Sequence, residues 1–336
     1  MILDSKRLPG ALEESMISYE RFAQWLLPFG VILALFVGLI WPSPGEVLGQ
    51  LQLGPLDAVA VTVIVIFLVS GVALLGASVQ REALPRAIVA VLALNLIAAP
   101  VLAGVSLAVL PLSSGLAFGV AAMASVPTTL SSATVLTQVA NGDRVWGAAL
   151  TVLCVFVGAL TAPLAVSLLL RTEATIPTGT LLLRLILLVL VPLGVGYGLA
   201  RMTGWRVNRI WRVVPSFGVI VLAWITVSQS ADSIEATPGA QLLEVVVLVI
   251  VAHAVMLILA RLAAMKFPRD RAVAVFFVTA QKTLPLALTV ISAVAALVPE
   301  LRAVASQAVI VAVLWHFVQT LVDGSIAARL GKVTAR

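Results

Sequence analysis

The chain has 336 residues, of which 61% are hydrophobic and 11% are charged, and its mean hydropathy is +1.15. This composition excludes a soluble globular domain and indicates one polytopic membrane domain. The formal net charge of +6 does not indicate binding to nucleic acid, because the basic residues follow the positive-inside rule of membrane proteins.

Ten apolar segments are long enough to span a bilayer, and they predict an all-α membrane protein. In chain order they cover residues 24–41, 58–79, 87–110, 115–139, 145–170, 178–200, 213–230, 239–260, 272–297 and 303–326. The first segment lacks a small-residue cleavage site, so we expect a retained span and not a signal peptide. Residues 1–23 and 329–336 are predicted to be cytoplasmic segments.

Basic residues gather on one side of these segments. With the N-terminus inside, 17 Lys and Arg residues face the cytoplasm, and only Arg171 and Arg302 face outward. Both termini are therefore predicted to be cytoplasmic, in a plasma (inner) membrane where the chain is expected to be a monomer. Cys154 is the only cysteine, which excludes intramolecular disulfides and a cysteine-cluster metal site.

The segments divide into two halves of five, residues 24–170 and 171–328, that resemble each other. Asn95 and His253 are lone polar residues 158 positions apart, and Pro127 and Pro285 interrupt segments 4 and 9 at the same separation. Because five is odd, the second half is inserted upside down, and paired interruptions in inverted repeats indicate the binding site of a transporter. We therefore predict discontinuous helices that cross near the membrane midplane, with breaks at 126–129 and 281–285.

Lys282 lies in the middle of segment 9, 11 residues after Arg271, which is about 16 Å of helix. At that depth in a hydrocarbon core of ~30 Å, a lysine does not readily reach water. The 15 Asp and Glu residues fall in predicted loops or near segment ends, Asp323 included, so we expect no carboxylate at mid-depth. The expected partners of the ammonium are backbone carbonyls, polar neighbours or a bound anion. A role in helix packing alone is the alternative.

Polar residues around the two prolines predict a site for substrate or ions. Its expected members are Asn95, Thr128, Thr129, Ser132, Thr134, Gln281, Lys282 and Thr283. Lys282, His253 and His316 are candidates for proton coupling, since imidazole titrates near neutral pH, and the alternative for both histidines is a satisfied place in the core. The spacings Gly115/Gly119 and Gly194/Gly198 predict close packing of helices.

Three stretches resemble the bile acid:sodium symporter family, and within it the SBF-like branch: 125–143, 278–285 and the pair Trp315-His316. The likeness covers about residues 22–328. It implies a core domain of segments 3–5 and 8–10, in which segments 4 and 9 cross. It also implies a panel of segments 1, 2, 6 and 7, a substrate between panel and core, and two sodium sites beside the crossing.

The family's binding residues carry over only in part. Its core glutamine resembles Asn95, its serine and asparagine after the first break resemble Ser132 or Ala133 and Thr134, and its glutamine at the second break resembles Gln281.

The glutamate shared by the family's sodium sites falls at Phe277, and an asparagine falls at Lys282. Sodium prefers oxygen ligands, so this departure predicts transport that is sodium-independent or coupled to proton release from Lys282.

The resemblance implies secondary active transport of an organic anion, either bile acid-like or a small carboxylate, by alternating access. The alternative is a non-transporting or regulatory membrane protein of the SBF-like branch, acting in ion or calcium homeostasis. Metalloid efflux, which a related family performs with a core cysteine, ranks third because Cys154 lies outside the broken segments. No enzyme or cofactor is expected, since paired intramembrane carboxylates, His-Glu-x-x-His and a nucleophile elbow are all missing.

Overall fold

The computed structural model describes residues 26–27, 29–54, 56–74, 84–130, 132–170, 176–205 and 208–334. In this part of the chain the protein is helical, apart from one short hairpin of β1 (Gln52–Leu53) and β2 (Leu56–Asp57) that pairs Gln52 with Asp57. The predicted cytoplasmic segment 1–23 lies outside the described residues.

Six helical stretches are long and apolar enough to cross a membrane. They are Leu84–Val109 (α4 Leu84–Leu92, η2 Ala93–Ala98 and α5 Ala99–Val109), α8 (Arg144–Leu169), Thr178–Thr203 (α9 Thr178–Leu185, η3 Ile186–Leu190 and α10 Val191–Thr203), α13 (Gly239–Ala264), Arg269–Leu297 (α14 Arg269–Ala280 and α15 Leu284–Leu297) and Ala305–Lys332 within α17 (Ala305–Thr334). The prediction of an all-α membrane protein is confirmed.

The first predicted segment differs from a straight span. The helix Phe29–Ile40 is followed, after a bend of 100°, by α2 (Ser43–Gln50), and the pair counts as a seventh span only if taken together. The bend coincides with Pro42, which cannot continue the hydrogen-bond ladder of the preceding helix.

The remaining predicted segments correspond to shorter helices. These are α3 (Ala58–Ala73), α6 (Ser114–Ser125) with α7 (Ser132–Val139), and α11 (Arg209–Ser228), and the loops add α12 (Ala231–Glu235) and α16 (Pro299–Arg302).

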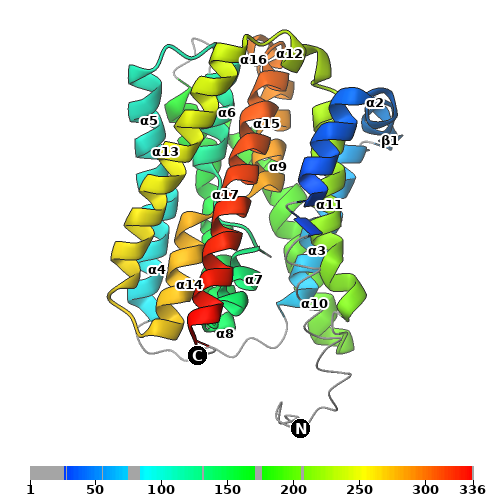
Figure 1. Ribbon diagram of the computed structural model, residues 1–336. Coiled ribbons are helices and arrows are strands. Elements are labelled where there is room, and N and C mark those ends of the chain that lie inside the picture. The colour runs from blue at the N-terminus through cyan, green and yellow to red at the C-terminus, as the bar shows by residue number, and fades with distance from the viewer. Residues whose placement is uncertain are drawn as a thin grey trace.

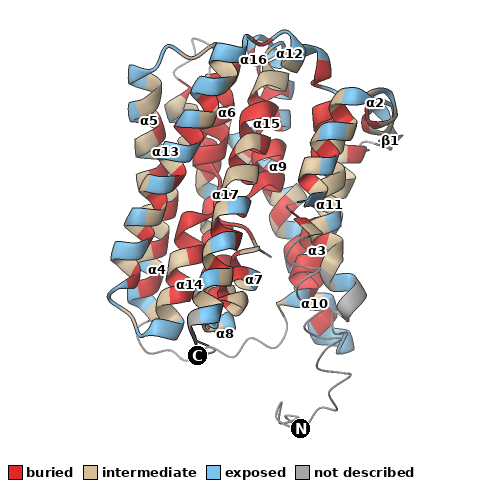
Figure 2. Ribbon diagram, viewed as in Figure 1, coloured by how far each residue is buried: buried red, intermediate tan, exposed pale blue. Residues whose placement is uncertain are grey.

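The helices form two groups that lie side by side (Figure 1). Helices α2, α3, α10 and α11 pack on one another, and α3 and α11 meet the second group at α15 and α17. In the second group the broken stretch Arg269–Leu297 runs through the middle, with 94% of its most apolar part buried, against 28% for the outer helix α13. Figure 2 shows this burial at the centre and exposed residues on the outer faces. An apolar, exposed perimeter is what a lipid-facing surface requires.

The glycine spacings predicted close packing of helices, and the structure shows it at one of the two spacings. A Cβ on Gly119 would meet Ala308 O at 2.6 Å, so α6 lies directly against α17. Gly194 and Gly198, by contrast, have open space beside them, and their predicted packing role is wrong. Gly196, on another face of the same helix, makes the close approach to α3 instead, at the backbone carbonyl of Leu68.

Helix α17 continues to Thr334, past the predicted segment end at residue 326. The extension places Asp323 well inside the helix.

Candidate functional site

The first break lies between α6 and α7. Val126 adopts an extended conformation, with φ −81° and ψ 154°, because the ring of the following proline disfavours a helical residue before it. Helix α6 therefore ends at Ser125, and the predicted break at 126–129 falls within the observed interruption.

The second break lies between α14 and α15. Gln281 and Thr283 are both extended, and Pro285 stands in the first turn of α15, where its missing N–H removes no helical hydrogen bond. The interruption covers 281–283, so the predicted break at 281–285 is two residues too long at its end.

The two breaks touch each other. The backbone N–H of Thr283 donates to the carbonyl of Pro127 at 2.9 Å. The Lys282 ammonium donates to the carbonyls of Ala124 at 2.9 Å and Val126 at 2.8 Å. These carbonyls belong to the C-terminal end of α6, where the helix dipole favours a cation.

Asn95 completes the shell around Lys282, which is only 1% exposed. The Asn95 backbone carbonyl accepts from the Lys282 ammonium at 2.5 Å, and the Asn95 side-chain Oδ1 accepts from it at 3.3 Å. The Asn95 amide Nδ2 donates to the carbonyls of Thr279 at 3.0 Å and Gln281 at 2.9 Å. Asn95 lies in η2, a π-helical turn that the sequence pattern did not predict; such turns are frequent at functional sites.

A buried carboxylate stands on the other side of the second break. Asp323 is fully buried, and its Oδ1 lies 2.9 Å from His253 Nε2, while its Oδ2 accepts from Gln281 Nε2 at 3.0 Å. The expectation of no carboxylate at mid-depth is therefore wrong. It failed because the last segment was ended at residue 326, eight residues before the helix ends.

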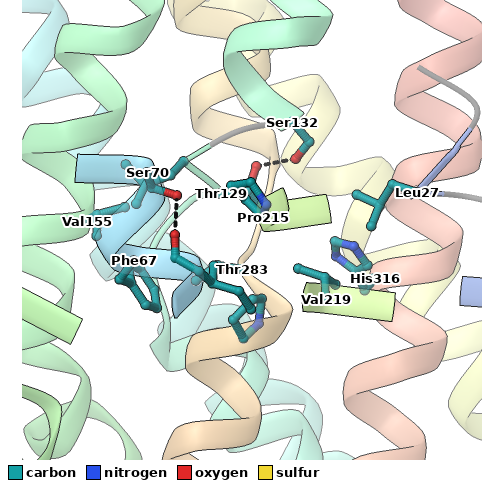
Figure 3. A pocket seen from close by; sticks show the side chains of 13 residues that line it. Leu27, Phe67, Ser70, Thr129, Ser132, Val155, Pro215, Val219, Thr283 and His316 are labelled. Atoms are coloured by element: carbon teal, nitrogen blue, oxygen red, sulfur yellow. Dashed lines mark hydrogen bonds between the residues drawn. The ribbon is translucent and has the colours of Figure 1, made fainter. Parts of the chain in front are cut away.

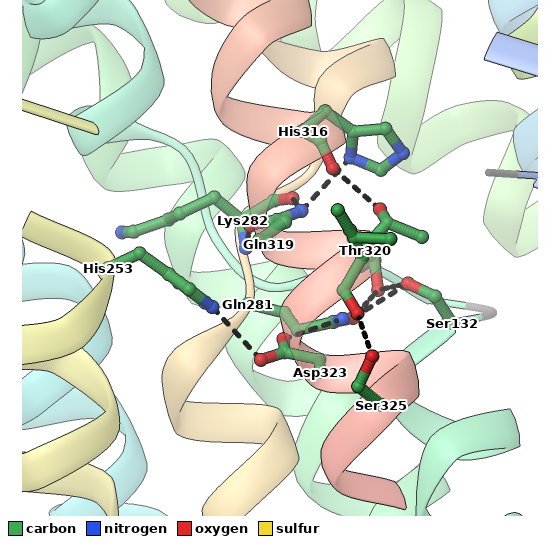
Figure 4. Close-up of polar contacts among 11 residues, drawn as sticks. Ser132, His253, Gln281, Lys282, His316, Gln319, Thr320, Asp323 and Ser325 are labelled. Atoms are coloured by element: carbon green, nitrogen blue, oxygen red, sulfur yellow. Dashed lines mark hydrogen bonds and ion pairs between the residues drawn. The ribbon is translucent and has the colours of Figure 1, made fainter. Parts of the chain in front are cut away.

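Gln281 joins this carboxylate to the first break. Its Oε1 accepts from Thr129 Oγ1 at 2.9 Å and from Ser132 Oγ at 2.7 Å, and these two hydroxyls also bond to each other. Figure 4 shows the path from His253 through Asp323 and Gln281 to Ser132.

Gln319 holds the backbone of Lys282 from α17. Its Oε1 accepts from the Lys282 N–H at 2.9 Å, and its Nε2 donates to the Lys282 carbonyl at 2.6 Å. The remaining amide hydrogen points to His316 Nδ1, 3.0 Å away. Because Nδ1 accepts, the imidazole proton lies on Nε2, which is buried and has no partner among the described residues.

Gln319 and Asp323 are the two members of this site that the sequence analysis missed. A signal was present, because His316, Gln319 and Asp323 follow one another at intervals of three and four residues. That spacing places all three on one face of a helix.

The predicted site residues are not all brought together. Asn95, Thr129, Ser132, Gln281 and Lys282 share the hydrogen-bonded network described above. Thr128 is buried, but its hydroxyl has no partner. The Thr134 hydroxyl of α7 bonds to Leu130 O, in the first break, at 3.2 Å, and so lies outside the network.

A pocket opens beside the breaks, between them and the helices α3 and α11. Apolar residues such as Phe67 and Val219 form most of its wall (Figure 3). Among the described residues, its polar lining consists of hydroxyls and one imidazole, from Ser70, Thr129, Ser132, Thr283 and His316.

The sodium sites that the resemblance implies do not fit these residues. The carbonyls at the end of α6 already accept from the Lys282 ammonium, and the Oε1 of Gln281 already accepts two hydroxyl hydrogens. Phe277, in place of the family's glutamate, offers no oxygen. A sodium ion here would have to displace a cation and break these hydrogen bonds.

Comparison with known proteins agrees with this architecture. A search of curated proteins found no match to the chain. The family model described as the SBF-like CPA transporter family (DUF4137) matches residues 24–332, nearly the whole chain, and it describes transporters, not enzymes. The resemblance to the SBF-like branch is thereby confirmed, and the chain belongs to the SBF-like CPA transporter family.

Proposed function

We propose that this protein is a secondary active transporter that carries an organic anion across the membrane by alternating access. Its family suggests secondary transport. The observation that carries the proposal is the pocket where both helix breaks meet, because interrupted helices at the centre of a transporter are where substrates bind.

The proposal includes ten spans arranged as two inverted repeats, with a panel of segments 1, 2, 6 and 7, to which α3, α10 and α11 belong, moving against a core. The 16 residues of α3 support it, since they correspond to about 24 Å of apolar helix, most of a hydrocarbon core of ~30 Å. Asn95 and His253 also support it. They lie 158 positions apart, as Pro127 and Pro285 do, and both reach Gln281, one directly and one through Asp323.

The pocket favours an anion with an apolar body. Its wall is mostly apolar, with a few hydroxyls and one imidazole, which is the lining typical of small-molecule sites. The Nε2–H of His316 is a buried donor without a partner at its edge. A carboxylate or sulfonate would accept from it and remove the penalty of an unpaired donor, about 1–3 kcal/mol.

The proposed coupling uses protons and not sodium. Lys282 supplies a positive charge among the carbonyls of Ala124, Val126 and Asn95, where relatives with a carboxylate would hold sodium. Sodium would then be unnecessary, and its gradient would do no work in transport.

The test is uptake into proteoliposomes of two sulfonates, a taurine-conjugated bile acid and benzenesulfonate, which stay ionised and so do not leak across as neutral acids. A proton gradient should drive uptake, and a sodium gradient alone should not. Thr283→Val removes a hydroxyl of the pocket and should lower uptake about tenfold, the effect of one hydrogen bond to a charged group.

Thr289→Val is the matched control, because that hydroxyl bonds only to Pro285 O in its own helix, at 2.8 Å. Sodium-dependent uptake that survives Lys282→Met unchanged would contradict the coupling. If neither sulfonate is taken up under any gradient, organic-anion transport is wrong, and the regulatory alternative gains support.

A further inference from the structure

His253 and Asp323 form a buried ionisable pair, here called the dyad, that the proposed function does not use. His253 is 2% exposed and Asp323 is fully buried, and they come from different helices, α13 and α17. The dyad contacts the pocket only through Gln281, whose amide lies between Asp323 and the two hydroxyls of Thr129 and Ser132.

The charge of Asp323 determines how these groups are oriented. An ionised carboxylate only accepts hydrogen bonds, so the Nε2 end of Gln281 must face it. The Oε1 end then faces Thr129 and Ser132. Their two hydroxyl hydrogens serve the three contacts among Oε1 and the two hydroxyls, so both hydrogens are used within this group. In this state both hydroxyls offer only lone pairs to the pocket, which disfavours an anion.

The dyad also determines where an added proton goes. His253 Nδ1 is buried without a partner, so a proton there would become an unpaired buried donor. A proton on Asp323 Oδ2 would instead face Gln281, which can accept it after its amide rotates by half a turn. Oδ1 stays paired with His253 Nε2 in both states.

We propose that the dyad is a proton-binding site that switches the pocket between a form that rejects anions and one that binds them. A proton from water forms an O–H bond at Asp323 Oδ2, and this hydroxyl donates to Gln281 Oε1. The inverted amide donates through Nε2 to Thr129 and Ser132, so a hydroxyl hydrogen becomes free to point into the pocket. Anion binding then takes up one proton, which rests on the proposed function of the pocket as the substrate site.

Other ionisable groups near the dyad do not replace it in this role. The Lys282 ammonium faces the opposite side of the second break and is not within 4.0 Å of the Asp323 carboxylate. His316 faces the pocket and Gln319. The other charged side chains of α12–α14, α16 and α17 lie near helix ends, outside the buried core: Asp232, Glu235, Glu244, Arg261, Arg269, Asp270, Arg271, Glu300, Arg302, Arg329 and Lys332.

The first test measures benzenesulfonate binding to the full chain in nanodiscs by titration calorimetry. The probe does not titrate, so proton uptake belongs to the protein. As the pH falls from about 8 to about 5, the affinity should rise by up to tenfold per pH unit, with one proton bound per anion, and level off once the free dyad is itself protonated. Buffers of different ionisation enthalpy give this proton count directly.

Three variants locate the effect. Asp323→Asn keeps a donor toward Gln281 at every pH, so binding should be tight, independent of pH and without proton uptake. The double variant Thr129→Val with Ser132→Ala keeps the dyad and removes the switched hydroxyls, so the pH dependence should disappear. Asp232→Asn, an exposed position on α12, is the matched control and should behave as the wild type.

Infrared difference spectra between the two pH values provide a second test that needs no ligand. A protonated-carboxyl band should appear at low pH in the wild type, together with a shift in a glutamine amide band, and both should be missing in Asp323→Asn. If the wild type binds benzenesulfonate equally at both pH values, the switch is wrong while the anion site stands. If the probe never binds, the proposal of an anion site is wrong. The infrared spectra then decide whether the dyad binds a proton, and absence of the carboxyl band overturns the proposed switch.

Discussion

At the scale of single residues, the buried core balances one positive and one negative charge without pairing them. The Lys282 ammonium is held by carbonyls of Asn95, Ala124 and Val126, and the Asp323 carboxylate by His253 and Gln281. Burying an isolated charge is costly unless hydrogen bonds compensate it. Each charge has its own set of partners, so either can change its contacts without leaving the other exposed to an apolar environment.

Gln319 is the residue that fixes Lys282 in place. One side-chain amide uses both of its ends on the backbone of a single residue, at 2.9 and 2.6 Å. The extended second break has no helical hydrogen bonds at this residue, so these two bonds replace what the helix would have supplied.

Gln319→Leu should therefore lower the thermal stability of the purified protein. It leaves a buried N–H and a buried C=O of Lys282 without partners, at about 1–3 kcal/mol each. The matched control is Gln307→Leu, on the same helix but half-buried near its start, where a single hydrogen bond of 3.2 Å to Ser113 is lost. Stability is measured by thermal unfolding in detergent. Equal losses in the two variants would contradict the prediction that the hydrogen bonds to the Lys282 backbone stabilise the protein more than the bond to Ser113 does.

At the scale of helices, the sequence predicted well where the helices are interrupted and poorly which of their side chains are buried against other helices. Proline restricts its neighbours locally, so Pro127 and Pro285 were sufficient to locate both interruptions. The π-helical turn at Asn95 and the bend after Ile40 depend on packing between distant segments, which periodicity does not contain. The same limit explains Asp323, because hydropathy alone could not tell a polar helix end from a buried polar face.

The glycines of α10 show the same limit and allow a direct test. Gly196→Ala would place its Cβ against the carbonyl of Leu68 in α3, where the backbone cannot move aside easily. We expect a loss of about 1–3 kcal/mol, as for other overpacked sites. Gly198→Ala, two residues away and facing open space, should be neutral or stabilising by about 0.5–1 kcal/mol, because alanine favours a helix. Thermal unfolding of the two variants compares them, and a stable Gly196→Ala would mean that α3 and α10 are not in close contact.

At the scale of the whole molecule, the basic residues give the protein a direction in the membrane. The starts of α8 and α14 and the end of α17 lie at one end of the molecule (Figure 1). Arg144, Arg269, Arg271, Arg329 and Lys332 belong to these helix ends. By the positive-inside rule we expect this end to be cytoplasmic and the opposite end, where α13 begins at Gly239, to face outward.

Thiol labelling tests this orientation, because the one native cysteine, Cys154, is fully buried and gives the wild type as an unlabelled background. Gly239→Cys and Met265→Cys place exposed thiols at the two ends of α13, and Lys332→Cys places one near the end of α17. On intact cells, a maleimide that cannot cross the membrane should label only Gly239→Cys. The other two should react only after the membrane is opened, since their ends carry the basic residues. The opposite pattern would reverse the orientation, and equal labelling at positions 239 and 265 would contradict a membrane-spanning α13.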